Sequence, residues 1–182
     1  MEGLLDATAA GLVEEGFGSL TTTRIAARAG VGVGTLYEYF PGKEALVATL
    51  AARLVARREA ALTATLEGSG SLSRRVYRWV SAWLRHEARS PALTTVVRAT
   101  MLELEGPEHL RQSLRGPEEV LRTLLRESGT YAPDVAVYLA VRSIDGVVAS
   151  WLLESPERLQ RPEVRNGLVQ LVLSVLASEQ AA

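Results

Sequence analysis

Cysteine is absent from this chain of 182 residues, and histidine is scarce. The lack of cysteine excludes disulfide bonds, thiolate metal ligands and cysteine nucleophiles together. The two histidines, His86 and His109, lie too far apart in sequence to serve as paired metal ligands on one helix. We therefore expect neither a metal site nor a cofactor.

Long apolar runs are also lacking. The most apolar stretch, near the C-terminus, is interrupted by Asp134, Arg142 and Asp145, so it stays short of the roughly 18 uninterrupted residues that suggest a membrane span. The N-terminus shows no basic segment followed by an apolar run, as a secretory signal would. These features predict a cytoplasmic protein with no membrane partner.

Charge of either sign is not in excess, since 20 basic and 21 acidic residues give a net charge of −1. This balance argues neither for nor against a nucleic-acid partner. With 47% apolar and 23% charged residues, the chain has the composition of a globular protein of one ordinary domain or two small ones.

Alternating strand patterns are nearly absent, and helical periods dominate. The sequence therefore predicts an all-α protein of about nine helices. The first ends near Gly16, and the others cover roughly residues 22–29, 33–39, 42–68, 72–89, 92–104, 107–129, with a break at Gly116-Pro117, and then 133–153 and 164–176.

The order helix, glycine-containing turn and short helix near the N-terminus is that of a helix-turn-helix unit, whose second short helix lies in the DNA major groove. Ala26 is small enough for close helix packing, and Val31 is expected to plug the turn. Leu36 and Phe40 lie four residues apart on one face, which predicts that both are buried. The rest of the second short helix is then free to contact DNA.

The segment from Leu20 to Leu46, LTTTRIAARAGVGVGTLYEYFPGKEAL, resembles the N-terminal domain of the TetR family of bacterial transcriptional regulators. The resemblance rests on many positions at set spacing, from the threonine-rich helix start to Lys43-Glu44-Ala45-Leu46. It implies two domains. Residues 1–46 would form a helix-turn-helix DNA-binding domain, and residues 47–182 an effector-binding and dimerisation domain.

The resemblance also implies which residues contact DNA. They are Thr22, Thr23, Val33, Gly34, Thr35, Tyr37, Tyr39 and Lys43. The two threonines would lie near a phosphate at the start of the supporting helix. The next three would form the tip of the recognition helix, and the tyrosines and the lysine would contact phosphates.

A small-molecule pocket among the C-terminal helices is a further implication of the resemblance. Its candidate lining residues are Trp79, Trp83, Arg98, Met101, Tyr138 and Trp151. An aromatic and aliphatic lining suits a largely apolar organic effector, with Arg98 available for an anionic end. The two tryptophans at i, i+4 are equally compatible with a purely structural core.

The two C-terminal helices are apolar on more than one face, which predicts a homodimer that pairs through them. Together with the resemblance, this predicts a ligand-responsive regulator, most simply a repressor, that binds a palindromic operator as a dimer and is released by its effector. Activation instead of repression would depend on operator position.

Two rival functions remain at this point. Residues 1–50 hold three basic and six acidic residues, a net charge of −3, although the segment from Thr21 to Lys43 carries +2. The acidic first helix keeps open a helical ligand-sensing or interaction module without specific DNA binding. An enzyme is disfavoured, because the sequence has no nucleophile elbow, no metal cluster and no histidine with a convincing catalytic partner.

Overall fold

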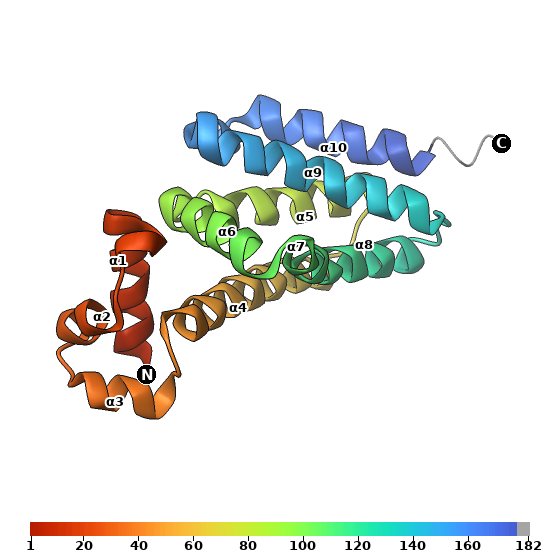
Figure 1. The fold of residues 1–182 in the computed structure, drawn as a ribbon. Coiled ribbons are helices and arrows are strands. Elements are labelled where there is room, and N and C mark those ends of the chain that lie inside the picture. Colours follow the sequence, from red (N-terminus) through yellow and green to blue (C-terminus); the bar gives the residue numbers. More distant parts are fainter. Residues whose placement is uncertain (178–182) are drawn as a thin grey trace. The chain divides into compact units, whose positions relative to one another are not determined.

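The computed structural model describes residues 1–177, which form helices and connecting turns without a strand (Figure 1). The fold is all-α, as the sequence predicts. The helices are α1 (Glu2–Ser19), α2 (Thr22–Ala29), α3 (Val33–Tyr39), α4 (Lys43–Thr63), α5 (Leu72–Glu87), α6 (Pro91–Glu105), α7 (Pro107–Ser113), α8 (Arg115–Glu127), α9 (Asp134–Glu154) and α10 (Pro162–Ala177), with 3-10 helices η1 (Ala64–Glu67) and η2 (Pro156–Gln160).

The chain divides into two compact units. The first unit contains Met1–Ala56 and Ala92–Leu110, and the second contains Arg57–Pro91 and the chain from Arg111 onward. Helix α4 contributes residues to both units. The expected functional boundary after residue 46 stays a prediction, and the last five residues of the expected second domain, 178–182, lie outside the described residues.

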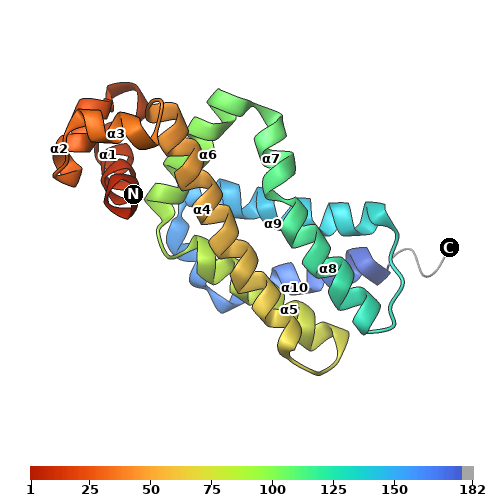
Figure 2. The ribbon, with the colours of Figure 1, turned by 90° about the horizontal axis from the view of Figure 1, so that it is seen from below.

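In the first unit, α1, α2 and α3 form a cluster in which α2 packs on both of its neighbours (Figure 2). Leu36 and Phe40 are buried in its core, which confirms the predicted inward face of α3. Ala26 is buried as well, where a small side chain allows the helices to approach closely. The core also contains Leu4, Leu5, Ala7, Leu12, Leu20, Ile25, Leu46, Val47, Leu50, Ala51, Val97 and Met101.

Two glycines shape the connections in this cluster. Gly16, with φ 73° and ψ 164°, interrupts the helical geometry of α1, so regular helix ends just before it, as predicted. Gly30 follows α2 with φ 71° and ψ 26°, and its backbone N–H donates to the Ala26 and Ala27 carbonyls. This left-handed cap is the conformation for which glycine is favoured, and it turns the chain toward α3.

Val31 does not plug the turn, contrary to the sequence-based prediction. Its backbone N–H donates to the Ala26 carbonyl at 3.0 Å as part of the α2 cap, and its side chain remains 38% exposed. The fully buried side chains next to this turn are instead Ile25 of α2 and Leu36 of α3, which belong to the core of the first unit.

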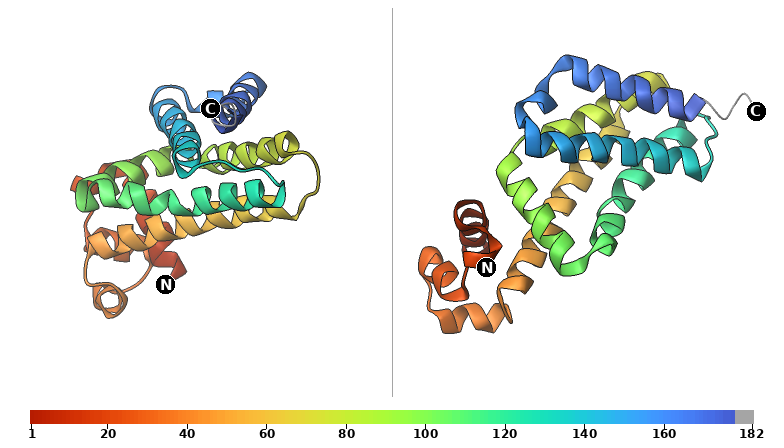
Figure 3. Two further views of the ribbon diagram at one scale, coloured as in Figure 1. Left: turned by 90° about the vertical axis from the view of Figure 1, so that its right-hand side faces the viewer. Right: turned by 45° about the horizontal axis from the view of Figure 1, so that its top comes forward.

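In the second unit, α5 packs against α8, α9 and α10. Helices α9 and α10 lie side by side and run in opposite directions (Figure 3). Trp79 and Trp83 of α5 are fully buried, with ring centroids 5.5 Å apart in an edge-to-face arrangement. Such a pair contributes apolar burial and favourable quadrupole contact together.

Arginines are also buried in the second unit. The side chain of Arg58 is 6% exposed and pairs with Glu87, whose side chain is 4% exposed, at 3.5 Å. The same guanidinium donates to the Ser113 carbonyl and lies 5.5 Å from the Trp83 ring centroid. Arg75 is similarly buried and pairs with Glu127. These charges are compensated inside the fold, as buried charges must be.

The helical pattern over 107–129 divides two residues earlier than predicted. Helix α7 ends at Ser113 and α8 begins at Arg115, so the break is at Leu114 and not at Gly116-Pro117. Pro117 lies in the first turn of α8, where its missing N–H costs no helical hydrogen bond. This division gives ten α-helices in the described residues where about nine were expected.

Helix α9 is long and apolar enough to cross a membrane by length and composition alone. Arg142 and Asp145 interrupt the apolar run of α9, so no such segment is expected from uninterrupted runs, but these two residues do not lower the mean hydropathy of the helix enough to exclude it. Core helices of globular proteins also meet this criterion. Here Val137, Val141 and Ile144 are buried against the rest of the second unit.

Candidate nucleic-acid interface

The start of α2 is fixed by Thr21, whose hydroxyl accepts a hydrogen bond from the Arg24 backbone N–H at 3.3 Å. This N-cap satisfies one of the donors that a helix start leaves without an intrahelical partner. The next residue, Thr22, lies within hydrogen-bonding distance of Tyr37, with 3.1 Å between the two hydroxyl oxygens. Thr23 is exposed. Two predicted DNA-contacting residues from different helices, Thr22 and Tyr37, are thus held together.

Helix α3 presents most of its surface to solvent. Leu36 is its only buried residue, and Tyr37 and Tyr39 are 54% and 57% exposed. Val33, Gly34 and Thr35 at its start are exposed as well. The predicted contact residues of α2 and α3 therefore belong to one compact unit, and all but the partly buried Thr22 are exposed.

Lys43 begins α4 and is held within the first unit. Its Nζ donates to the Phe17 carbonyl at 2.9 Å and lies 4.3 Å from the centroid of the Phe17 ring. The contact connects the C-terminal end of α1 to the start of α4. Lys43 would have to lengthen or exchange this hydrogen bond to meet a DNA phosphate.

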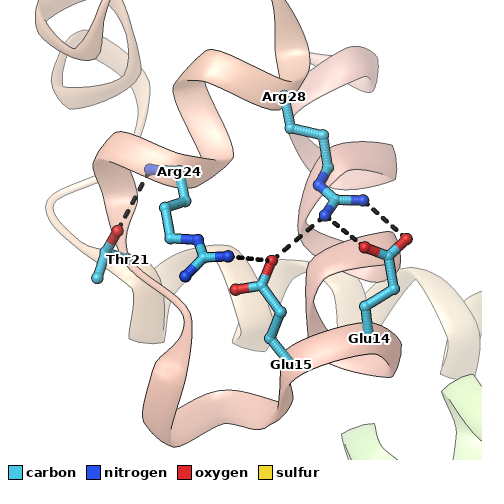
Figure 4. Close-up of polar contacts among 5 residues, drawn as sticks. All are labelled: Glu14, Glu15, Thr21, Arg24 and Arg28. Atoms are coloured by element: carbon cyan, nitrogen blue, oxygen red, sulfur yellow. Dashed lines mark hydrogen bonds and ion pairs between the residues drawn. The ribbon is translucent and has the colours of Figure 1, made fainter.

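Two arginines of α2 pair with two glutamates of α1 (Figure 4). Arg28 donates to both carboxylate oxygens of Glu14, at 2.9 and 2.5 Å. One carboxylate oxygen of Glu15, Oε1, forms ion pairs with the Nη2 atoms of both arginines, at 3.0 Å for Arg24 and 3.3 Å for Arg28. The hydrogen bond from Arg28 lowers the pKa of Glu14, and the same bond raises the pKa of Arg28. All three basic residues of the first 50 therefore have partners inside the first unit.

No functional role was predicted from the sequence for Arg24, Arg28 or their glutamate partners. A local signal was present, because Arg24 and Arg28 lie four residues apart and so share a face of α2. The position of Glu14 and Glu15 opposite that face depends on how α1 packs against α2, which is not a local property.

The predicted effector residues occupy different environments. Tyr138 is half exposed, with the guanidinium carbon of Arg142 at 4.9 Å from its ring centroid, and Trp151 is partly buried. The indole N–H groups of Trp79 and Trp83 are buried without a hydrogen-bond partner in the described residues. Burying such a donor without an acceptor is unfavourable.

The structure does not collect the six effector candidates in one compact unit. Arg98 and Met101 belong to the first unit, where Met101 is part of the core, and the other four belong to the second unit. A depression of about 390 Å³ lies at the α8–α9 connection. Its lining residues are Arg122, Leu125, Arg126, Gly129, Thr130, Tyr131, Ala132, Asp134 and Val137, which include none of the candidates. The effector residues stay predictions.

Metal ligands are not clustered in the part of the chain that the structure describes. Within residues 1–177, no group of three or more His, Cys, Asp or Glu side chains is placed to hold a metal ion.

Residues 4–50 match the sequence profile of the bacterial regulatory proteins of the tetR family. This match spans the cluster α1–α3 and the start of α4, and it includes every predicted DNA-contacting residue. The N-terminal domain of the chain is therefore a domain of this family. The members of the family are regulatory proteins, which are generally not enzymes.

The proteins that resemble this chain differ in how much of it they cover. The nucleoid occlusion factor SlmA of Pasteurella multocida is 32% identical over 99 residues, which are 52% of this chain and 48% of SlmA. The alignment therefore spans about half of that relative.

Solved structures resemble the chain over almost its whole length. A transcriptional regulator from Rhodococcus sp. Rha1 has a TM-score of 0.76 and 22% identity, covering 98% of this chain and 96% of that one. The fatty acid degradation regulator FadR of Bacillus halodurans has a TM-score of 0.72 and 21% identity, with coverage of 96% and 91%. At these identities the comparison establishes the fold, which is that of TetR-family regulators with an N-terminal helix-turn-helix domain.

Proposed function

We propose that this protein is a cytoplasmic transcriptional repressor that binds a palindromic DNA operator as a homodimer and is released by a small, largely apolar effector. The observation that carries the proposal is the surface of α2 and α3. Leu36 anchors α3 in the core, while the tyrosines and small residues around it face solvent. An exposed short helix of this kind, supported by a second helix, fits a DNA major groove.

Gly34 supports this role for α3. It lies within a helix, is exposed, and an added Cβ would meet nothing within 4 Å. Neither backbone conformation nor packing therefore requires glycine here, although glycine in a helix costs about 0.5–1 kcal/mol relative to alanine. Close approach of a DNA base edge or backbone accounts for the missing side chain. Thr35 beside it offers a hydroxyl to a phosphate or base.

Homodimerisation through α9 and α10 is supported by an exposed apolar stripe on α9. Val135, Tyr138, Leu139 and Leu153 lie on one helical face and are all exposed, Leu153 at 74%. Leu171 on α10 is exposed as well. A second copy of the chain, placing the same surface against this one, would remove both patches from water.

The dimer is tested by sedimentation velocity of Leu139→Glu. Because a charge at the centre of an apolar interface is costly, we expect this variant to be monomeric at concentrations where the wild type is a dimer. Leu102→Glu is the matched control, since Leu102 is an exposed leucine on α6. A wild-type monomer, or a dimer unaffected by Leu139→Glu, would contradict this interface.

The effector is proposed to accept hydrogen bonds from Trp79 and Trp83, the two buried donors that lack an acceptor. A largely apolar compound with a carbonyl or carboxylate group fits these requirements. Its preferential binding to a conformation with low DNA affinity would release the operator, with α4 coupling the two units because its residues belong to both.

The experiment that tests DNA binding is selection of genomic fragments by the purified protein, followed by titration of a recovered fragment. We expect a palindrome, and affinity that falls as salt rises. Tyr39→Ala and Lys43→Ala are each expected to weaken binding about tenfold or more, with helicity retained. Tyr131→Ala, which removes an 80% exposed tyrosine of the second unit, is the control and should have no effect.

The second candidate is a ligand-sensing or interaction module without specific DNA binding, which the net charge of −3 over residues 1–50 favours. The same selection separates the two functions. A folded dimer that enriches no sequence would support the module and contradict the repressor.

A further inference from the structure

Resting on the proposed DNA binding, we propose that Arg24 is an additional phosphate-binding residue, and that Glu15 holds it in the free protein and competes with DNA for it. DNA binding would then exchange one ion-pair partner of Arg24 for another. A carboxylate of α1 is replaced by a phosphate of the operator, while Arg28 stays bound to α1.

Arg24 is positioned for such an exchange. It lies in the first turn of α2, directly after the predicted contact residues Thr22 and Thr23, and its side chain is 60% exposed. Its ion pair is a single contact of 3.0 Å to Glu15 (Figure 4). Exposed single ion pairs contribute little to stability, so a phosphate can displace the carboxylate at small cost.

Arg28 differs from Arg24 in both respects. Its side chain is only 33% exposed, and it donates to both oxygens of Glu14 as well as contacting Glu15. Bidentate pairs of this geometry are the stronger kind. Arg28 is therefore the structural member of the cluster, and Arg24 is the exchangeable one.

Glu15 keeps a positively charged partner when Arg24 leaves, because it also contacts Arg28. Its side chain is 15% exposed, and its Oε1 is shared between Arg24 and Arg28. Its Oε2 is buried without a hydrogen-bond partner in the described residues, so this carboxylate is already poorly satisfied. When Arg24 leaves, Arg28 still compensates the charge of Glu15, which lowers the cost of the exchange.

Because residues 1–50 contain few basic side chains, one more phosphate contact should change DNA affinity noticeably. Residues 1–50 have only three basic side chains, and Lys43 is held by the Phe17 carbonyl. Each phosphate that is neutralised contributes through counterion release. One additional arginine therefore changes both the affinity and its salt dependence.

The test is titration of a selected genomic fragment with wild type, Glu15→Gln, Glu14→Gln and Glu15→Gln/Arg24→Gln at several salt concentrations. Glu15→Gln is expected to bind about threefold to fivefold more tightly than wild type at low salt, because the competing charge is removed. Glu14→Gln makes the same change in net charge beside Arg28 but leaves the Arg24 contact intact, so it should gain clearly less. Circular dichroism establishes that each variant is folded.

The double variant isolates Arg24. Relative to Glu15→Gln, it is expected to lose the gain in affinity, and the slope of log affinity against log salt should fall in magnitude by about 0.9, the value for one phosphate contact. A purely structural role of Arg24 would leave this slope unchanged, and that result would overturn the inference.

The remaining outcomes are also decisive. Equal gains for Glu14→Gln and Glu15→Gln would mean that only net charge matters, and would overturn the inference while leaving the proposed function in place. Absence of DNA binding by both wild type and Glu15→Gln would overturn the proposed function, and the inference with it.

Discussion

The two compact units use arginine–glutamate pairs in opposite ways. In the first unit, Arg24 and Arg28 pair with Glu14 and Glu15 at the surface, where at least one partner of each pair is accessible. In the second unit, Arg58 pairs with Glu87 where both side chains are almost fully buried. The difference teaches that an exposed side chain with a single ion-pair contact, such as Arg24, can exchange partners at low cost, whereas a buried pair is fixed in the fold because its charges cannot regain water.

The largest expected effect is that of Arg58→Met. The variant removes the cation facing Glu87 and the donor to the Ser113 carbonyl, so we expect the free energy of unfolding to fall by about 3–5 kcal/mol. Urea denaturation followed by circular dichroism measures it. A loss below about 1 kcal/mol would mean that the buried pair contributes no more to stability than an exposed pair, which would contradict the comparison of the two units.

Gly34→Ala is expected to change stability and DNA affinity in opposite directions. Since an added Cβ meets nothing within 4 Å, helix α3 should gain about 0.5–1 kcal/mol of stability. In the proposed complex the same methyl group would face DNA, so affinity for a selected fragment should fall. Thermal denaturation and titration of one preparation give both values, and unchanged affinity would contradict close DNA approach at this position.

Arg28→Gln is the exposed counterpart of Arg58→Met. It removes the bidentate contact to Glu14 and the contact to Glu15, but Arg24 still pairs with Glu15, and both Arg28 and Glu14 are accessible to water. The free energy of unfolding should therefore fall by much less than in Arg58→Met. The same urea titration applies. A loss as large as that of Arg58→Met would show that exposure does not distinguish the two kinds of pair.

The smallest expected effect is a dependence of stability on pH through His86 in the second unit. Burial, and next the nearby Arg58, Arg89 and Arg57, lower the pKa of His86 below its ordinary value of 6.5. The unfolded chain therefore binds more protons than the folded protein around pH 6, so stability falls as pH drops through 6.5 toward the folded pKa.

Melting temperatures at about pH 7.5 and about pH 5.5 test this dependence in wild type and His86→Gln. The melting temperature of His86→Gln should fall less than that of wild type between the higher and the lower pH. Glu14 behaves differently, because its lowered pKa adds stability above its ordinary value of 4.5 that is lost only as pH falls through the folded pKa. An equal fall for wild type and His86→Gln would remove His86 as the cause.

The bounds of α2 and α3 were predictable from sequence because their signals are local. Thr21 caps one end of α2, Gly30 adopts the left-handed conformation at the other, and Leu36 sets the buried face of α3. The exposure of Val31 was not predictable, because it depends on how α2 and α3 pack around the turn that joins them. Local sequence features therefore determine where these helices begin and end, whereas packing between helices determines which side chains remain exposed.

The ion pairs and the effector residues show the limit of sequence reasoning more clearly. Arg24 and Glu15 are nine positions apart, and nothing local indicates that α1 and α2 bring them to 3.0 Å. Trp79 and Trp83 could be predicted to share a helical face. Whether their indole N–H groups find an acceptor depends on side chains from several helices, which sequence spacing does not specify.

The measurement that tests the central claim most directly is a footprint of the wild-type protein on a selected genomic fragment. If two copies place α3 in the major groove, the account predicts two protected regions related by a palindrome, with centres about 34–36 Å apart along the DNA. Gly34→Ala should weaken both regions equally. A single protected region, or two regions that remain fully protected in Lys43→Ala and Tyr39→Ala, would contradict recognition by this surface.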